Sequence, residues 1–203
     1  MNKNLIRWLP IFALNFVPIT LNSSSHAQMV MGPSGMEMGI KSMTALEKLS
    51  GKQFDIAWMS QMIAHHKGAL EMAQKCLKTC EKLYVKKAAT TIINVQTKEI
   101  LQMKHWLKAW YAVAPDKEQM ALMRGDIQNM MDSTLSGMVP TEGEAQADKA
   151  FLEGMIPHHQ SAVDMAKVAV AKAVKSELKI FAQRIITDQS KEIKLFQSWF
   201  KKL

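Results

Sequence analysis

Two pairs of adjacent histidines, each flanked by methionines, are the residues of this sequence best suited to chemistry. The first pair lies in "QMIAHHKGALEMA" (residues 61–73) and the second in "GMIPHHQSAVDMA" (residues 154–166). Neutral imidazole and thioether together form a soft ligand set, which suits Cu(I) and, by the same chemistry, Ag(I). Hard cations prefer oxygen ligands, and the helix face that would carry the histidines has almost none. The pattern predicts two soft-metal sites with the ligands Met62, His65, His66, Met72, Met155, His158, His159 and Met165.

Ordinary packing is the alternative interpretation of these residues. A lone histidine on an apolar helix face is more often a hydrogen-bonded core residue, and a stripe of methionines is usually core. Two copies with matching positions are harder to explain by packing alone, so they favour metal binding. A di-iron centre is not expected, because methionine replaces the glutamate of the Glu-x-x-His motif before both His65 and His158.

The histidine pairs belong to an internal duplication. When the chain is aligned with itself at an offset of 93 residues, identical residues coincide at many positions along a stretch of roughly 55. One helical hairpin cannot bury its apolar stripe alone, whereas two related hairpins can bury theirs against each other. The duplication therefore predicts a bundle with approximate two-fold symmetry. Matched pairs outside the histidine segments include Asp55 with Asp148, Gln96 with Gln189, Glu99 with Glu192, and Trp106 with Trp199.

The apolar pattern predicts helices and no sheet. Apolar residues recur at steps of three and four in both copies, which indicates two amphipathic helices in each. The helices should break near residues 78–83 and 174–178, with Ser176 as a cap. The predicted fold class is all-α, a four-helix bundle over residues 44–203. It is built from two duplicated hairpins, at about 50–110 and about 143–203.

The segment between the copies, residues 111–143, is too long for a simple loop. Asp116 is placed to cap a helix, and the apolar pattern after it is broken, so one short connecting helix is expected. Thr141 and Glu144 resemble a capping box at the start of the third main helix. Pro157 should kink the helix beside the second histidine pair, so the two sites need not be equal.

The first 27 residues have the composition of a secretory signal peptide. Lys3 and Arg7 precede an apolar stretch, and residues 25–27 offer a small-x-small cleavage site, so the mature chain is expected to begin near Gln28. A membrane anchor is the alternative, although the apolar stretch is shorter than the ~20 residues of a membrane span and contains prolines. We expect a periplasmic or secreted protein with no stable membrane insertion.

Residues 28–43 combine five methionines with glycine, proline and serine and show no apolar face. They are expected to form a mobile, methionine-rich N-terminal arm whose thioethers bind copper weakly. His105 is predicted to lie near the surface, where it would suit Cu(II) as well. The candidate weaker metal ligands are Met29, Met31, Met36, Met38, Met43 and His105.

Charge and motif content argue against several function classes. The formal net charge of +8 is spread along helix surfaces instead of forming a basic patch, which does not favour nucleic-acid binding. No nucleophile, base and orienting group form a catalytic set, so a binding protein is expected and not an enzyme. A haem-binding electron-transfer bundle is the alternative function, but the sequence lacks the Cys-x-x-Cys-His attachment motif.

The two cysteines, Cys76 and Cys80, are four residues apart and would share one face of a helix. A disulfide at a frayed helix end in an oxidising compartment is one interpretation, although regular helical geometry strains it. One core thiol with one exposed thiol is the second. Metal binding is the third, and Ala169 and Ala173 at the equivalent positions of the second copy count against it.

The paired "MI-x-HH-x-x-A-[LV]-[ED]-MA" segments, followed by "Q-x-KEI" and a late tryptophan, resemble a ferritin-like family long catalogued only as a domain of unknown function. The likeness extends over both hairpins and, with the methionine-rich exported N-terminus, is greatest to its periplasmic copper-binding members. It implies a four-helix bundle that holds Cu(I) or Ag(I) through consecutive core histidines, acting as a metallochaperone or copper-resistance protein. It also implies a copper efflux or sensor protein as a partner. Carried over by motif, the ligands are Met62, His65 and His66 in one site and Met155, His158 and His159 in the other.

Overall fold

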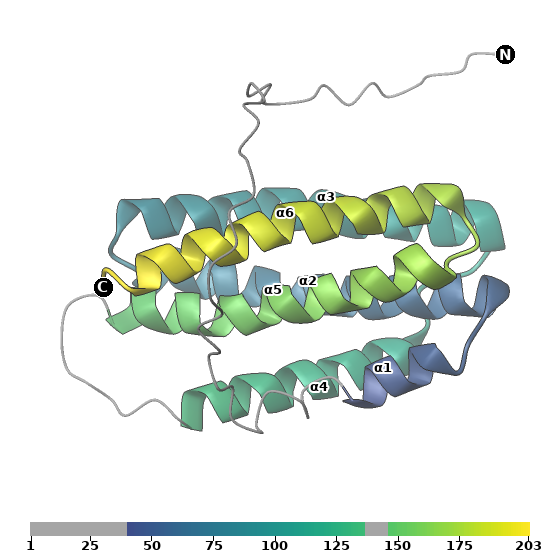
Figure 1. Ribbon diagram of the computed structural model, residues 1–203, viewed down its shortest axis with the longest axis horizontal. Helices are drawn as coiled ribbons and strands as arrows, with labels where there is room; N and C mark the ends of the chain where they lie inside the picture. The colour runs from purple at the N-terminus through teal and green to yellow at the C-terminus, as the bar shows by residue number, and fades with distance from the viewer. Residues whose placement is uncertain (1–39, 137–145) are drawn as a thin grey trace, which may run out of the picture. The chain divides into compact units, whose positions relative to one another are not determined.

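Helices account for all the regular secondary structure in the part of the chain that the computed structural model describes, residues 40–136 and 146–203. None of the helices in this part has the length and apolar character needed to cross a membrane. The signal segment, the arm as far as Gly39 and the capping box at Thr141 and Glu144 lie outside the described residues. The helices are α1 (Ile40–Glu47), α2 (Gly51–Thr79), α3 (Leu83–Tyr111), α4 (Lys117–Ser136), α5 (Gln146–Lys172) and α6 (Ser176–Phe200) (Figure 1).

The two hairpins have matching boundaries. α2 ends at Thr79 and α5 at Lys172, while α3 begins at Leu83 and α6 at Ser176, so both boundaries recur at an offset of 93 residues. Each hairpin packs internally, α2 on α3 and α5 on α6, and the hairpins meet where α2 packs on α5. The all-α, four-helix fold is therefore confirmed.

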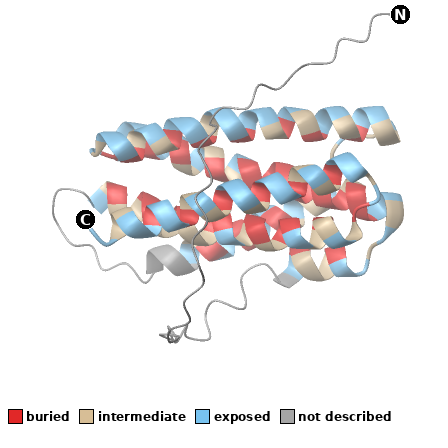
Figure 2. Cartoon of the chain, turned by 45° about the horizontal axis from the view of Figure 1, so that its top comes forward, coloured by how far each residue is buried: buried red, intermediate tan, exposed pale blue. Residues whose placement is uncertain are grey.

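The core lies around α2 and α5, because these helices have neighbours on both sides. α3 and α6 cover one side, and α4 packs on α2 and α5 from the other (Figure 1). Residues 57–66 of α2 are buried without interruption, which an amphipathic surface helix would not show. Figure 2 shows the buried positions concentrated where the helices face one another. The first histidine pair falls within this fully buried stretch.

The connecting helix is longer than expected. α4 has 20 residues and packs against the core through Met123, Ile127 and Met130, so the prediction of a short helix is wrong. The apolar pattern after Asp116 is broken because α4 contacts the bundle along one narrow stripe of residues only. The predicted cap is confirmed, since Asp116 Oδ1 accepts hydrogen bonds from the backbone N–H groups of residues 118 and 119.

An unpredicted helix, α1, begins at Ile40, so residues 40–43 of the expected arm are helical. The chain has no glycine or proline between Gly39 and Gly51, and Met43 packs partly buried against the core. Ser42 joins α1 to its neighbours, because its N–H donates to Asp126 of α4 and its carbonyl accepts from Gln61 of α2. The last four residues of the predicted arm, 40–43, therefore belong to α1.

Two buried aspartates connect the hairpins, because each one caps the second helix of the opposite hairpin. Asp55 of α2 accepts hydrogen bonds from the N–H groups of Val174 (3.0 Å) and Lys175 (3.2 Å), at the start of α6. Asp148 of α5 accepts equivalent bonds, both 3.1 Å, from residues 81–82 at the start of α3. Orphan N–H groups at a helix start favour a negative side chain, so each carboxylate stabilises the opposite hairpin.

The predicted cap at Ser176 is wrong. Ser176 is the first residue of α6, and its hydroxyl donates to the Glu177 side chain at 3.0 Å. Lys175 occupies the cap position without a side-chain cap bond, and the acceptor comes from Asp55, about 120 residues earlier in the chain. A local sequence signal cannot reveal an acceptor that tertiary folding delivers.

Candidate metal centre

The four paired histidines come together where α2 packs on α5. All four side chains are fully buried. The rings of His65 and His158, one from each hairpin, have centroids 3.9 Å apart, and each is 6.2 to 6.4 Å from the ring of its neighbouring histidine. The two pairs that are 93 residues apart in sequence are therefore one continuous cluster in space.

The two central histidines are neutral. Burial lowers the pKa of His65 and of His158 well below the ordinary imidazole value, and charge on the neighbouring histidines would lower it further. A neutral imidazole has one N–H and one nitrogen with a free lone pair. Each central ring can thus serve as a metal ligand without first losing a proton.

Most ring nitrogens in the cluster lack a hydrogen-bond partner among the described residues. They are Nδ1 of His65, His66, His158 and His159, and Nε2 of His66 and His158. Buried polar atoms are nearly always paired, since an unpaired one costs about 1–3 kcal/mol. Since each neutral ring leaves one nitrogen with a free lone pair, these buried imidazoles fit the donor set that a metal ion requires.

Two glutamates that the ligand prediction missed reach the outer histidines. Glu192 Oε2 lies 2.8 Å from His159 Nε2 in an aligned hydrogen bond, and Glu99 Oε2 lies 2.8 Å from His66 Nε2 without that alignment. A carboxylate at Nε2 favours the proton there and leaves the Nδ1 lone pair for a metal. The available signal was a glutamate within each apolar stripe at the 93-residue offset.

The central rings have unequal surroundings. His65 Nε2 lies 3.2 Å from Ser161 Oγ, whereas the position equivalent to Ser161 in the first hairpin is Gly68. A Cβ at Gly68 would lie 3.4 Å from His158 Nε2, so glycine leaves that nitrogen bare. This inequality comes from a serine–glycine difference between the hairpins. Pro157, which was expected to make the sites unequal by a kink, lies inside α5.

The four predicted methionine ligands lie in two apolar clusters, each with one methionine from each hairpin. Met62, Met155 and Met165 are buried, and Met72 is partly buried. Met72 belongs with Met155, since its Cε would come within 2.9 Å of a Cβ at Gly154 in α5, while Met62 and Met165 share the other apolar cluster. Packing of α2 on α5 therefore places each of these methionines in an apolar cluster with one from the opposite copy.

The sequence matches the family described as a domain of unknown function (DUF305) over residues 8–107 and again over residues 76–200. The chain belongs to the DUF305 family. Among solved structures it is similar to CopM in the Cu(II)-bound form, with 29% identity and a TM-score of 0.60 over 73% of this chain and 96% of that one. CopM in the Ag-bound form gives 30% identity and a TM-score of 0.59 over 73% and 95%.

A putative secreted DUF305 protein from Streptomyces coelicolor is also similar, with 25% identity and a TM-score of 0.58 over 70% of this chain and 88% of that one. No match was found among curated proteins. The family and the fold are thus shown by two kinds of comparison, of sequence and of structure.

The weaker candidates of this DUF305 member lie on helices other than α2 and α5 or outside the described residues. His105 is exposed on α3, as predicted, and Met43 packs in α1. Cys76 and Cys80 are both buried and form a disulfide, which excludes the pairing of a core thiol with an exposed one. Within residues 40–136 and 146–203, no three His, Cys, Asp or Glu side chains are placed to share one ion. The methionines at positions 29, 31, 36 and 38 lie outside the described residues.

Proposed function

We propose that this protein is an exported copper-binding metallochaperone or copper-resistance protein, and not an enzyme. Its similarity to copper- and silver-bound forms of CopM suggests a copper-related function. The observation that carries the proposal is the set of buried, unpaired imidazole nitrogens in a core rich in methionine. Such donors favour soft monovalent ions, so Cu(I) is the cargo and Ag(I) its analogue.

Each outer histidine would present Nδ1 to the ion while its glutamate orients the ring. Glu99 serves His66 and Glu192 serves His159. Met62 and Met165 lie in one apolar cluster and Met155 and Met72 in the other, and their thioethers are the soft donors available to complete the sites. Carboxylate, imidazole and ion form the arrangement by which proteins fix the tautomer of a ligating histidine.

A competition titration tests the proposal. The protein should bind Cu(I) and Ag(I) under anaerobic conditions, and an excess of zinc should not displace them, because thioether sulfur favours soft ions over zinc. The measurement is Cu(I) transfer from a chromogenic chelator of known affinity, with and without zinc. Equal competition by zinc, or no transfer from the chelator, would overturn the soft-site proposal.

The orienting glutamates give a second prediction. Glu192→Gln and Glu99→Gln should each weaken Cu(I) binding at the pair that the residue serves by about 10- to 100-fold, since loss of an outer-shell partner typically has that effect. The larger loss is expected for Glu192, whose hydrogen bond to His159 is aligned. The control is Glu71→Gln, which changes an exposed glutamate of α2. If Glu71→Gln weakened Cu(I) binding as much as the other two variants, Glu99 and Glu192 would have no specific orienting role.

The N-terminal methionines give a third prediction. Deleting residues 28–39 should slow Cu(I) loading or weaken copper tolerance while leaving the melting temperature nearly unchanged, because its thioethers would pass copper on by ligand exchange. The deletion stops at Gly39 so that α1 and its packed Met43 stay in place. Stopped-flow loading and a growth assay with copper compare the two chains. Identical behaviour in both assays would leave the bundle as the sole copper-handling part.

A further inference from the structure

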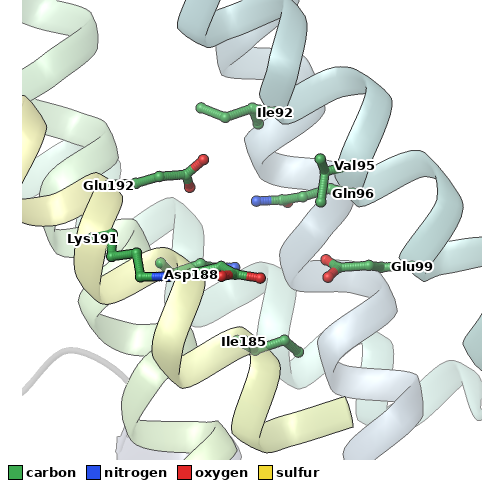
Figure 3. A pocket seen from close by; sticks show the side chains of 9 residues that line it. Ile92, Val95, Gln96, Glu99, Ile185, Asp188, Lys191 and Glu192 are labelled. Carbon is green, nitrogen blue, oxygen red and sulfur yellow. Dashed lines mark ion pairs between the residues drawn. The ribbon is translucent and has the colours of Figure 1, made fainter. Parts of the chain in front are cut away.

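The α3–α6 seam contains a cleft of about 290 Å³, which the proposed histidine ligands do not line. Aromatic contacts join the two helices on either side of it along the chain, Tyr84 with Trp199 (ring centroids 4.8 Å apart) and Trp106 with Phe181 (5.3 Å). Between these contacts the helices separate, and polar side chains from both line the space (Figure 3). The cleft thus lies over the middle of the bundle.

The lining carries an excess of negative charge in a protein whose net charge is +8. Glu99, Asp188 and Glu192 contribute three carboxylates against the single ammonium group of Lys191, which lies 3.7 Å from Asp188. Gln96 and Glu192 extend toward one another across the space (Figure 3). A cleft lined by one sign of charge raises the local concentration of the opposite ion.

Two buried amide oxygens point to a cation as the occupant. Oε1 of Gln96 and Oε1 of Gln189 have no hydrogen-bond partner among the described residues, although the side chains are only 3% and 5% exposed. Both glutamines line the cleft, at positions that are equivalent under the 93-residue offset. Buried carbonyl oxygens without donors present negative charge to a cation, and because oxygen ligands hold a soft ion only weakly, they suit its passage and not its retention.

The same glutamates connect the cleft to the histidine cluster. Glu99 and Glu192 line the cleft and are partly exposed, yet their Oε2 atoms lie 2.8 Å from His66 and His159. We propose that the α3–α6 cleft is a cation-binding vestibule through which the metal ion reaches and leaves both histidine pairs. This inference rests on the proposed copper function. It assigns Gln96, Gln189 and Asp188 to attracting and relaying the ion, and not to holding it.

A steric block tests the route. Val95 lines the cleft and is 46% exposed, and Cys76 and Cys80 form a disulfide, so Val95→Cys supplies a single thiol for a bulky maleimide. Leu101→Cys with the same label is the matched control, on an exposed position of α3 outside the lining. Ag(I) uptake and release are followed by stopped-flow fluorescence, with Trp58 beside Met165 as a reporter. Circular dichroism confirms that both labelled chains are folded.

Blocking a route raises one barrier for both directions. The label at position 95 should therefore slow Ag(I) uptake and release by the same factor, about tenfold or more, and leave the Kd unchanged. Asp188→Asn should slow uptake at low salt only, whereas Asp132→Asn on α4 should not. Equal rates in the two labelled chains, or a label that changes the Kd by slowing only one of the two steps, would overturn the vestibule. Failure of the unlabelled full chain to bind Ag(I) would instead overturn the copper function itself.

Discussion

Replacing His65 and His66 together with alanine should reduce the Cu(I) capacity of the protein by about half, because each pair supplies the nitrogen ligands of one soft-metal site. The remaining pair should still bind, but with altered affinity, since His158 loses the ring that lies 3.9 Å away. Anaerobic titration of Cu(I) against a competing chelator gives the number of ions bound and their affinities. The reciprocal change of His158 and His159 should give the complementary result.

Two further variants separate ligand loss from damage to the core. Alanine at fully buried positions leaves a cavity, so His65→Phe combined with His66→Phe restores ring volume without restoring a nitrogen. This double variant should lose the same site, while its free energy of unfolding should stay closer to that of the original chain. His105→Ala changes an exposed histidine of α3 and should leave capacity unchanged. Loss of all binding in the double variants, or of none, would contradict the assignment of one site to each pair.

Asp55→Ala should lower the free energy of unfolding by about 3 kcal/mol, because it removes charge-assisted hydrogen bonds to three donors. Its carboxylate is fully buried and accepts from the Tyr111 hydroxyl at 2.7 Å, as well as from the N–H groups of Val174 and Lys175. Burial, together with this bond, raises the pKa of Tyr111. The phenol therefore keeps its proton and donates this hydrogen bond at neutral pH. Urea unfolding followed by circular dichroism measures the loss.

Asp148→Ala is the matched comparison within the same chain. Its carboxylate caps α3 through residues 81–82, as Asp55 caps α6, but among the described residues no tyrosine donates to it. We therefore expect a loss about 1 kcal/mol smaller than that of Asp55→Ala. Asp55→Asn retains one acceptor oxygen. Its loss of unfolding free energy should fall between the losses of Asp148→Ala and Asp55→Ala. Equal losses in all three variants would mean that the hydrogen bonds at position 55 do not determine the effect.

Apolar spacing and the 93-residue offset by themselves determined the all-α class and the main helix breaks. Both signals are local or internally repeated, so no knowledge of packing was needed. The histidine pairs were identifiable for the same reason, because adjacent histidines beside methionine at matching positions stand out in each copy. Asp116 was recognised as a cap because its acceptor and donors lie within a few residues of one another.

Only the tertiary structure decided which side chains meet. Packing of α2 on α5 places His65 against His158 and brings Met72 to Gly154, which periodicity within one helix cannot show. The same holds for Glu99 and Glu192, which reach the histidines from the neighbouring helices, and for Asp55, which caps a helix that begins about 120 residues later. Sequence spacing fixes which residues share a face of one helix. The partner of that face depends on how separate helices pack, and that is a property of the whole fold.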